Sequence, residues 1–79
     1  MSVARIQLTL NAKNLWDLEV VEDGSISNCQ DIESILTAVE IAKSYCYDEY
    51  GLNILFDVVR STRTHIIYDV HSKRLSKSA

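Results

Sequence analysis

The spacing of the apolar residues changes twice along the chain, and this change restricts the fold more than any other feature. Apolar and polar side chains alternate over residues 4–10 and again over residues 16–20, which is the period of a strand with one buried face. From residue 32 to residue 50 the spacing becomes three and four, which is the period of an amphipathic helix. Alternation returns after Gly51. The sequence therefore predicts an α+β fold in the order ββ(β)αββ: an antiparallel sheet of four to five strands, made of two hairpins flanking one helix and packed on that helix.

The predicted helix has one apolar stripe and candidate ends on both sides. Ser27, Asn28 and Asp31 are candidate N-caps, and Gly51 is a suitable terminator. Between the Asp23-Gly24 turn and these caps there is room for only a short third strand, at residues 25–27. The stripe consists of Ile32, Ile35, Leu36, Val39, Ala42, Cys46 and Tyr50.

The second predicted hairpin can pair in two registers. A loop at residues 61–63 would place six apolar side chains on the core face in opposed pairs. These pairs are Val58 with Ile66, Phe56 with Tyr68 and Ile54 with Val70. A two-residue loop would set Ile54 opposite Asp69, which is a poorer arrangement, so we predict the first register.

Length and composition indicate one small domain. The chain has 79 residues, of which 47% are hydrophobic and 24% charged, as is typical of a globular protein. We expect residues 1–72 to form the domain and residues 73–79 to form a mobile basic tail. There is no apolar run near the roughly 20 residues of a membrane span and no secretory pattern at the N-terminus, so we predict a cytoplasmic chain. If Cys29 lies in the first turn of the helix, it is too far from Cys46 for a disulfide, and both thiols are expected to be free.

No sequence pattern points to catalysis or to a cofactor. With only two glycines, Gly24 and Gly51, the chain has no phosphate-binding loop. None of the serines lies in a glycine-flanked elbow, and neither cysteine has a histidine nearby in sequence. The preferred register gathers four candidate metal ligands on the outer sheet face, but their spacing matches no metal motif. These four are Asp57, His65, Asp69 and His71. We therefore predict that the chain is not an enzyme and binds no cofactor and no metal.

The predicted surface has two features that suit a protein partner. Ile41 and Tyr45 lie off the core stripe and one helical turn apart, so they form a candidate contact patch. Charge is also uneven, because nine of the eleven acidic residues lie between residues 17 and 49, whereas five basic residues follow residue 59. The acidic residues proposed to contact a partner are Asp17, Glu19, Glu22 and Asp23. We predict a regulatory domain that docks on another protein and self-associates as a homodimer.

In size, acidity and single-domain shape the chain resembles proteins of phages and mobile elements that block host defence machinery by binding it. This likeness implies an inhibitor whose acidic side chains occupy a nucleic-acid-binding surface of the target. The alternative is a small nucleic-acid-binding module built on the basic C-terminal hairpin and tail, although the pI of about 5.2 weighs against it. Its candidate residues are Arg60, Arg63, Lys73, Arg74 and Lys77.

Overall fold

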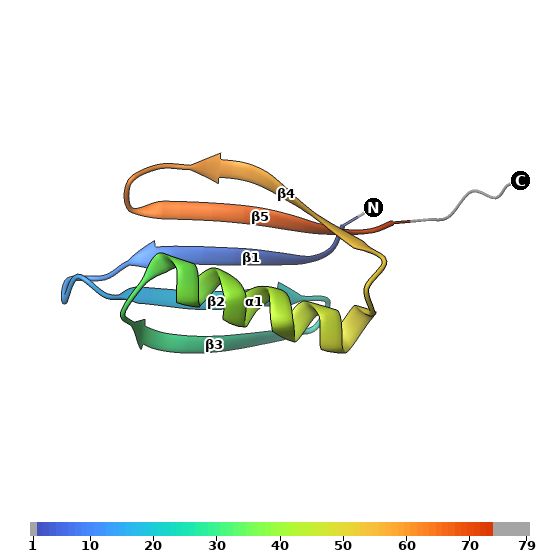
Figure 1. Ribbon diagram of the computed structural model, residues 1–79, viewed down its shortest axis with the longest axis horizontal. Coiled ribbons are helices and arrows are strands. Elements are labelled where there is room, and N and C mark those ends of the chain that lie inside the picture. Colours follow the sequence, from blue (N-terminus) through green and yellow to red (C-terminus); the bar gives the residue numbers. More distant parts are fainter. Residues whose placement is uncertain (1, 74–79) are drawn as a thin grey trace, which may run out of the picture.

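The computed structural model describes residues 2–73, which form a five-stranded antiparallel sheet with one helix on one face (Figure 1). The elements are β1 (Ser2–Leu10), β2 (Trp16–Glu22), β3 (Ser25–Ile32), α1 (Ile35–Tyr50), β4 (Ile54–Ser61) and β5 (His65–Ser72). The strand order in the sheet is β3-β2-β1-β5-β4. The predicted α+β fold is confirmed, with three consecutively paired strands before the helix in the sequence and one hairpin after it. Apart from Lys73, the predicted tail lies outside the described residues.

The core lies between the helix and the central strands. β1 pairs with β2 on one side and with β5 on the other, so alternate β1 residues face α1 from the middle of the sheet. The helix contributes mostly small side chains to this core, which lets its backbone approach the sheet closely. The buried core residues are Ala4, Ile6, Leu8, Leu18, Val20, Ile32, Ala38, Ala42, Cys46, Ile54 and Val70.

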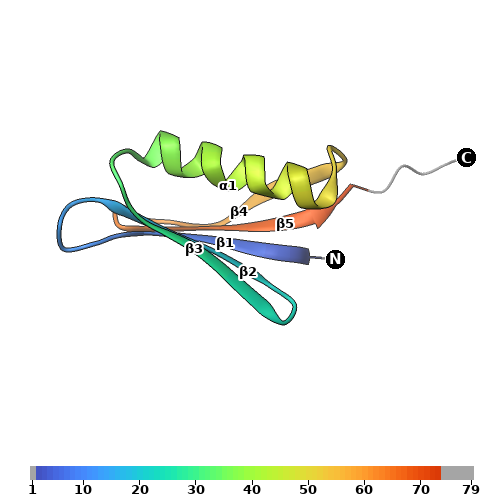
Figure 2. The same ribbon diagram turned by 90° about the horizontal axis from the view of Figure 1, so that it is seen from below.

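The helix covers only part of the sheet. Its main contacts are with β1, β2 and β3, and β5 and β4 lie to one side of it (Figure 1). The view turned by 90° shows α1 on one side of the sheet (Figure 2). Leu36, which the sequence placed on the core stripe, is 74% exposed, so that prediction is wrong. The reason is that α1 contacts mainly β1, β2 and β3, so the flank that carries Leu36 is poorly covered by the sheet.

The helix also begins later than predicted. Ser34 is the N-cap, because its Oγ accepts a hydrogen bond from the Thr37 backbone N–H at 3.1 Å. Ile32 is a buried strand residue opposite Trp16 and does not belong to the helix. Cys29 lies on β3 and not in the first turn of the helix, so the assumption from which its distance to Cys46 was predicted is wrong. Both thiols are nevertheless free. The three residues predicted as N-caps belong to β3: Ser27, Asn28 and Asp31.

The second hairpin has the predicted faces but a different register. Val58 opposes Tyr68, Phe56 opposes Val70 and Ile54 opposes Ser72, a shift of two residues from the predicted pairs. The Thr62 N–H donates to the His65 carbonyl at 2.8 Å, which closes a tight turn over the two residues between them. Val59 is then the extra residue of a β-bulge. A shift of the pairing by two residues leaves every side chain on the same face of the sheet. The predicted faces of the side chains were therefore correct, and the predicted cross-strand pairs were wrong.

Candidate functional site

The part of the sheet that the helix leaves uncovered carries an apolar surface, which we call the open face. Tyr47 packs edge-on against Phe56, with ring centroids 5.6 Å apart, and Lys43 Nζ lies 5.4 Å from the centre of the same ring. Leu36 lies three turns before Tyr47 on the same flank of α1. Val58 is 58% exposed on the helix side of β4. The open face consists of Leu36, Tyr47, Phe56, Val58, Ile66 and Tyr68.

One border of the open face is an unpaired strand edge. β4 is the last strand of the sheet, contains no proline or lysine, and exposes apolar side chains on both faces. The opposite edge, β3, is largely polar, and each edge strand contains a bulge: β4 at Val59, and β3 near Asp31, whose φ is 59°. Polar side chains and bulges both hinder the pairing of strand edges with other chains, so the two edges differ in the apolar side chains that β4 exposes and not in the presence of a bulge. The β4 edge is therefore the more available of the two for a partner strand.

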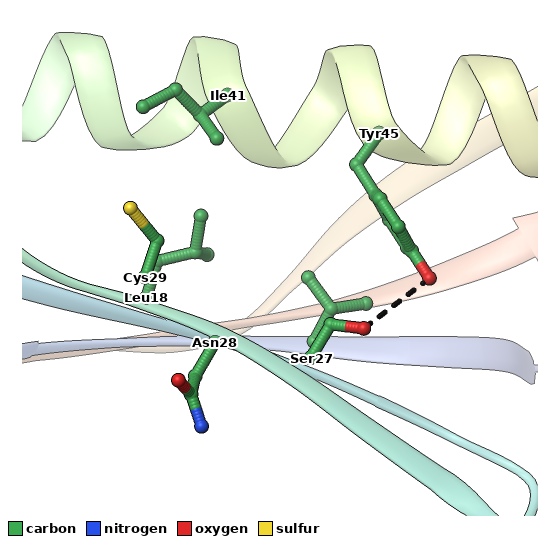
Figure 3. Close-up of a pocket in the computed structure, with 7 residues that line it drawn as sticks. Leu18, Ser27, Asn28, Cys29, Ile41 and Tyr45 are labelled. Atoms are coloured by element: carbon green, nitrogen blue, oxygen red, sulfur yellow. Dashed lines mark hydrogen bonds between the residues drawn. The ribbon is translucent and has the colours of Figure 1, made fainter.

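The predicted contact pair, Ile41 and Tyr45, lies on the other flank of α1, toward β3. Both residues line a small apolar pocket of about 100 Å³ between the helix and β2–β3 (Figure 3). Ile41 is 39% exposed, whereas Tyr45 is half-buried and its hydroxyl lies 3.4 Å from Ser27 Oγ. Cys29 lies on the same side of β3 and points toward Ile41 (Figure 3). The pair thus partly covers its own sheet, and its role in binding a partner stays a prediction.

Glu22 joins the end of β2 to the C-terminal half of the helix. Its carboxylate accepts hydrogen bonds from the Tyr45 hydroxyl at 2.8 Å, from the Tyr50 hydroxyl and from the Ser25 hydroxyl at 3.5 Å. The bonds from Tyr50 and Tyr45 hold the pKa of Glu22 below its usual value of 4.5.

Burial, together with the charge of Glu22, raises the pKa of the Cys46 thiol to about 11, so this thiol is protonated at neutral pH and is a poor nucleophile.

Replacing Glu22 with glutamine tests this connection. The folded-state pKa of Glu22 is lowered, so the ionised carboxylate stabilises the folded state above about pH 4.5. This contribution to the free energy of unfolding declines as the pH falls through the folded-state pKa. We expect Glu22→Gln to lower the free energy of unfolding by about 1 kcal/mol at neutral pH, a small value because the carboxylate is partly solvated. Urea denaturation of both proteins should show this difference shrinking below about pH 4.5. A difference that does not vary with pH would contradict the charged hydrogen bonds.

The four predicted acidic contact residues do not share one surface. Asp17 and Glu19 alternate with the buried residues of β2, so they face away from the helix, whereas Glu22 is turned toward it. Asp17 Oδ1 accepts hydrogen bonds from Asn11 Nδ2 at 2.9 Å and from the Asp31 backbone N–H at 3.2 Å. Asp23 is exposed in the turn between β2 and β3. Asp17 therefore stabilises the local structure around Asn11 and Asp31. Of the four acidic residues, only Glu19 and Asp23 make no side-chain hydrogen bond within residues 2–73.

The predicted basic residues are divided between the two ends of the second hairpin. Arg60 and Arg63 lie at or beside its closed end, and Lys73 follows the last residue of β5. The eight residues of β5 separate these ends by roughly 25 Å. Arg74 and Lys77 lie outside the described residues. The basic residues that the structure describes thus form no single patch, and nucleic-acid binding stays a prediction.

The four candidate metal ligands lie on the outer sheet face, as predicted, but are already paired or separated. Asp57 opposes Asp69, and Arg5 Nε donates to Asp69 Oδ1 at 2.9 Å. This bond and the charge of Arg5 hold the pKa of Asp69 below its usual value. His71 Nε2 lies 3.3 Å from Asp57 Oδ2, and His65 is at the far end of β5. Within residues 2–73, no three His, Cys, Asp or Glu side chains are grouped closely enough to hold a metal ion.

Comparison with known proteins gives no family for this chain: no protein-family model matches it, and neither does a curated protein or a solved structure. Within the described residues, no helix has the length and apolar character needed to span a bilayer. The surfaces of the domain itself are therefore the features that indicate its function. Sequence periodicity found Ile41 and Tyr45 but missed the open face, because Leu36 and Val58 fit the core pattern and only the position of the helix leaves them exposed.

Proposed function

We propose that this chain is a non-enzymatic, cytoplasmic interaction domain that acts by docking on another protein through the open face. The observation that carries the proposal is the partial cover of the sheet, because it leaves Leu36 74% and Val58 58% exposed on the helix side. Exposed apolar side chains on one side of a small domain are a common feature of protein-binding sites. The free thiols of Cys29 and Cys46 fit a reducing compartment.

Docking at this position would combine two kinds of interaction. Burial of the open face would supply non-directional apolar binding energy, and the N–H and C=O groups of the β4 edge are available for main-chain hydrogen bonds to one further strand, from the partner or from a second copy of this chain. Lys43, beside Phe56, would add a positive charge at the border. A regulator or inhibitor of a host protein is the finer form of this proposal, and it is supported by the small size and low pI of the chain.

The test compares two exposed apolar residues on opposite sides of the domain, one on the helix and one on the sheet face that points away from the helix. Leu36→Glu places a charge on the open face, and Ile26→Glu places the same charge on an exposed side chain of β3 that faces away from the helix. Each immobilised protein is incubated with lysate of the cells that encode it, and bound proteins are quantified by mass spectrometry. We expect at least one protein to be retained by the wild type and by Ile26→Glu, and to be reduced about tenfold or more by Leu36→Glu.

Circular dichroism would establish that both variants are folded before capture is compared. A bound protein that both variants lose equally would contradict a role for the open face. If no protein is retained by the wild type and lost by Leu36→Glu, the docking proposal itself is wrong.

A further inference from the structure

We infer that the β4 edge pairs with the β4 edge of a second copy of this chain, in antiparallel orientation, about a twofold axis that passes between the two Val58 residues. This inference names a partner for the edge that borders the open face and so builds on the proposed function. It depends on the side chains of β4, the sheet edge that exposes more apolar side chains than β3.

The bulge at Val59 sets the register. Along a regular strand, Asp57 and Arg60 would point to opposite faces, because they are three positions apart. Val59 is an extra residue, however, so Asp57 opposes Asp69 and Arg60 opposes Ile67, and both side chains lie on the outer face. Two charges of opposite sign therefore stand on one face of the exposed edge strand, one on each side of Val58.

A twofold axis perpendicular to the sheet keeps every side chain on its own face, so opposed residues must come from the same face. With Val58 opposite its own copy, the next pair on the outer face is Asp57 with the partner's Arg60, and the symmetric pair repeats it. The dimer would contain two ion pairs across the new strand pairing. Moving the axis to Asp57 would set two like charges against each other, and moving it to Phe56 would set Asp57 against the partner's Leu55.

The charges around Asp57 favour the same register. Its direct cross-strand neighbour is a second carboxylate, Asp69, and like charges in opposed positions are destabilising. Arg5 is bonded to Asp69, and His71 beside Asp57 carries a charge only when protonated. The Asp57 side chain is 67% exposed, and Arg60 forms no ion pair in the part of the chain that the structure describes. The partner's Arg60 would supply the permanent positive charge that Asp57 lacks.

This pairing would change the docking surface as well as the oligomeric state. The two sheets would become one continuous antiparallel sheet of ten strands, with both helices on the same side. The two open faces would then meet across the axis at Val58, and a docking partner would contact one apolar surface built from two copies.

Reversing the charges tests both the dimer and its register. Asp57→Arg and Arg60→Asp each convert the two attractive pairs into repulsive ones, so each variant alone should raise the dimer dissociation constant about tenfold or more. Mixing the two variants in equal amounts should restore a dimer, because each then meets its opposite charge across the axis. The double variant should dimerise like the wild type. Solution mass by light scattering over a concentration series measures the wild type, the two single variants, their mixture and the double variant.

Matched controls carry the same charge changes at exposed turn positions, Asp23→Arg and Arg63→Asp, and should dimerise like the wild type. A monomeric wild type, single variants that remain dimeric, or a mixture that remains monomeric would each overturn the inference. The Leu36→Glu capture experiment is independent of these results, since Leu36 lies on the helix and away from the β4 edge. Loss of the dimer therefore leaves docking by a single copy open to its own test.

Discussion

Replacing Leu8 with alanine is expected to lower the free energy of unfolding by about 2–5 kcal/mol. Leu8 is completely buried on the central strand, between Leu18 of β2 and Ile66 of β5. Its removal leaves a cavity that no neighbouring loop can fill, because both flanking positions are held by the sheet. At roughly 0.05–0.15 kcal/mol per residue, a domain of this size has a total stability of about 4–12 kcal/mol. The variant should therefore lose a large part of its stability.

The matched control is Leu36→Ala, the same substitution at an exposed leucine of the open face. Alanine favours the helix, and no cavity forms, so its effect should stay within about 0.5 kcal/mol. Urea denaturation followed by circular dichroism measures both variants. If Leu8→Ala does not fold, Leu8→Met keeps most of the volume and should cost less than about 1.5 kcal/mol. Equal losses from Leu8→Ala and Leu36→Ala would contradict the arrangement of helix and sheet.

The second large effect is expected at Gly51, where alanine should cost about 1–3 kcal/mol. Gly51 ends the helix with φ 82° and ψ −175°, a conformation that only glycine adopts readily, and its N–H donates to the Tyr47 carbonyl at 2.9 Å. An added Cβ would meet no atom within 4 Å, so the expected cost comes from the backbone alone. The residue matters because it turns the chain from α1 into β4.

Leu52→Ala is the control for Gly51→Ala, since Leu52 is the next residue and its side chain is largely exposed. Its effect on the urea midpoint should be small. Gly51→Ala with the stability of the wild type would show that the turn after the helix does not need a positive φ.

The first hairpin and the central core could be predicted from sequence because each depends on a local pattern. Ile6 and Leu8 alternate with polar residues on β1, as Leu18 and Val20 do on β2, and all four are buried. The polar break after β1 and the period change before α1 gave the order of elements. These signals come from strands that have one face on the core and one in water.

β3 could not be predicted in full because it is an edge strand with little core contact. Of its eight residues only Ile32 is buried, so no alternation distinguishes it from a loop. Ser27, Asn28 and Asp31 are also ordinary N-cap residues, and Ile32 fits the helical spacing to Ile35. The sequence pattern therefore assigned this segment to the helix. Residues 25–32 form a strand because they pair with β2, and this pairing is a tertiary contact that the local sequence pattern does not contain.

The register of the second hairpin and the open face depended on features that periodicity does not contain. The bulge at Val59 adds one residue to one strand, and no residue type near it marks the position. The exposure of Leu36 and Val58 depends on how far α1 is displaced toward β3 across the sheet. Both features come from packing between elements distant in sequence.

The pairing of β1 with β5 has a consequence for how the chain is made. Arg5 and Asp69 form an ion pair although they are 64 positions apart in sequence. During synthesis, β1, β2, β3 and α1 leave the ribosome well before β5, so one edge of the central strand has no neighbour for most of that time. Ordering such distant contacts is slow because the loop between them must close first. We expect the addition of the β4–β5 hairpin to limit the folding rate, and the nascent chain to be most prone to aggregation just before this step.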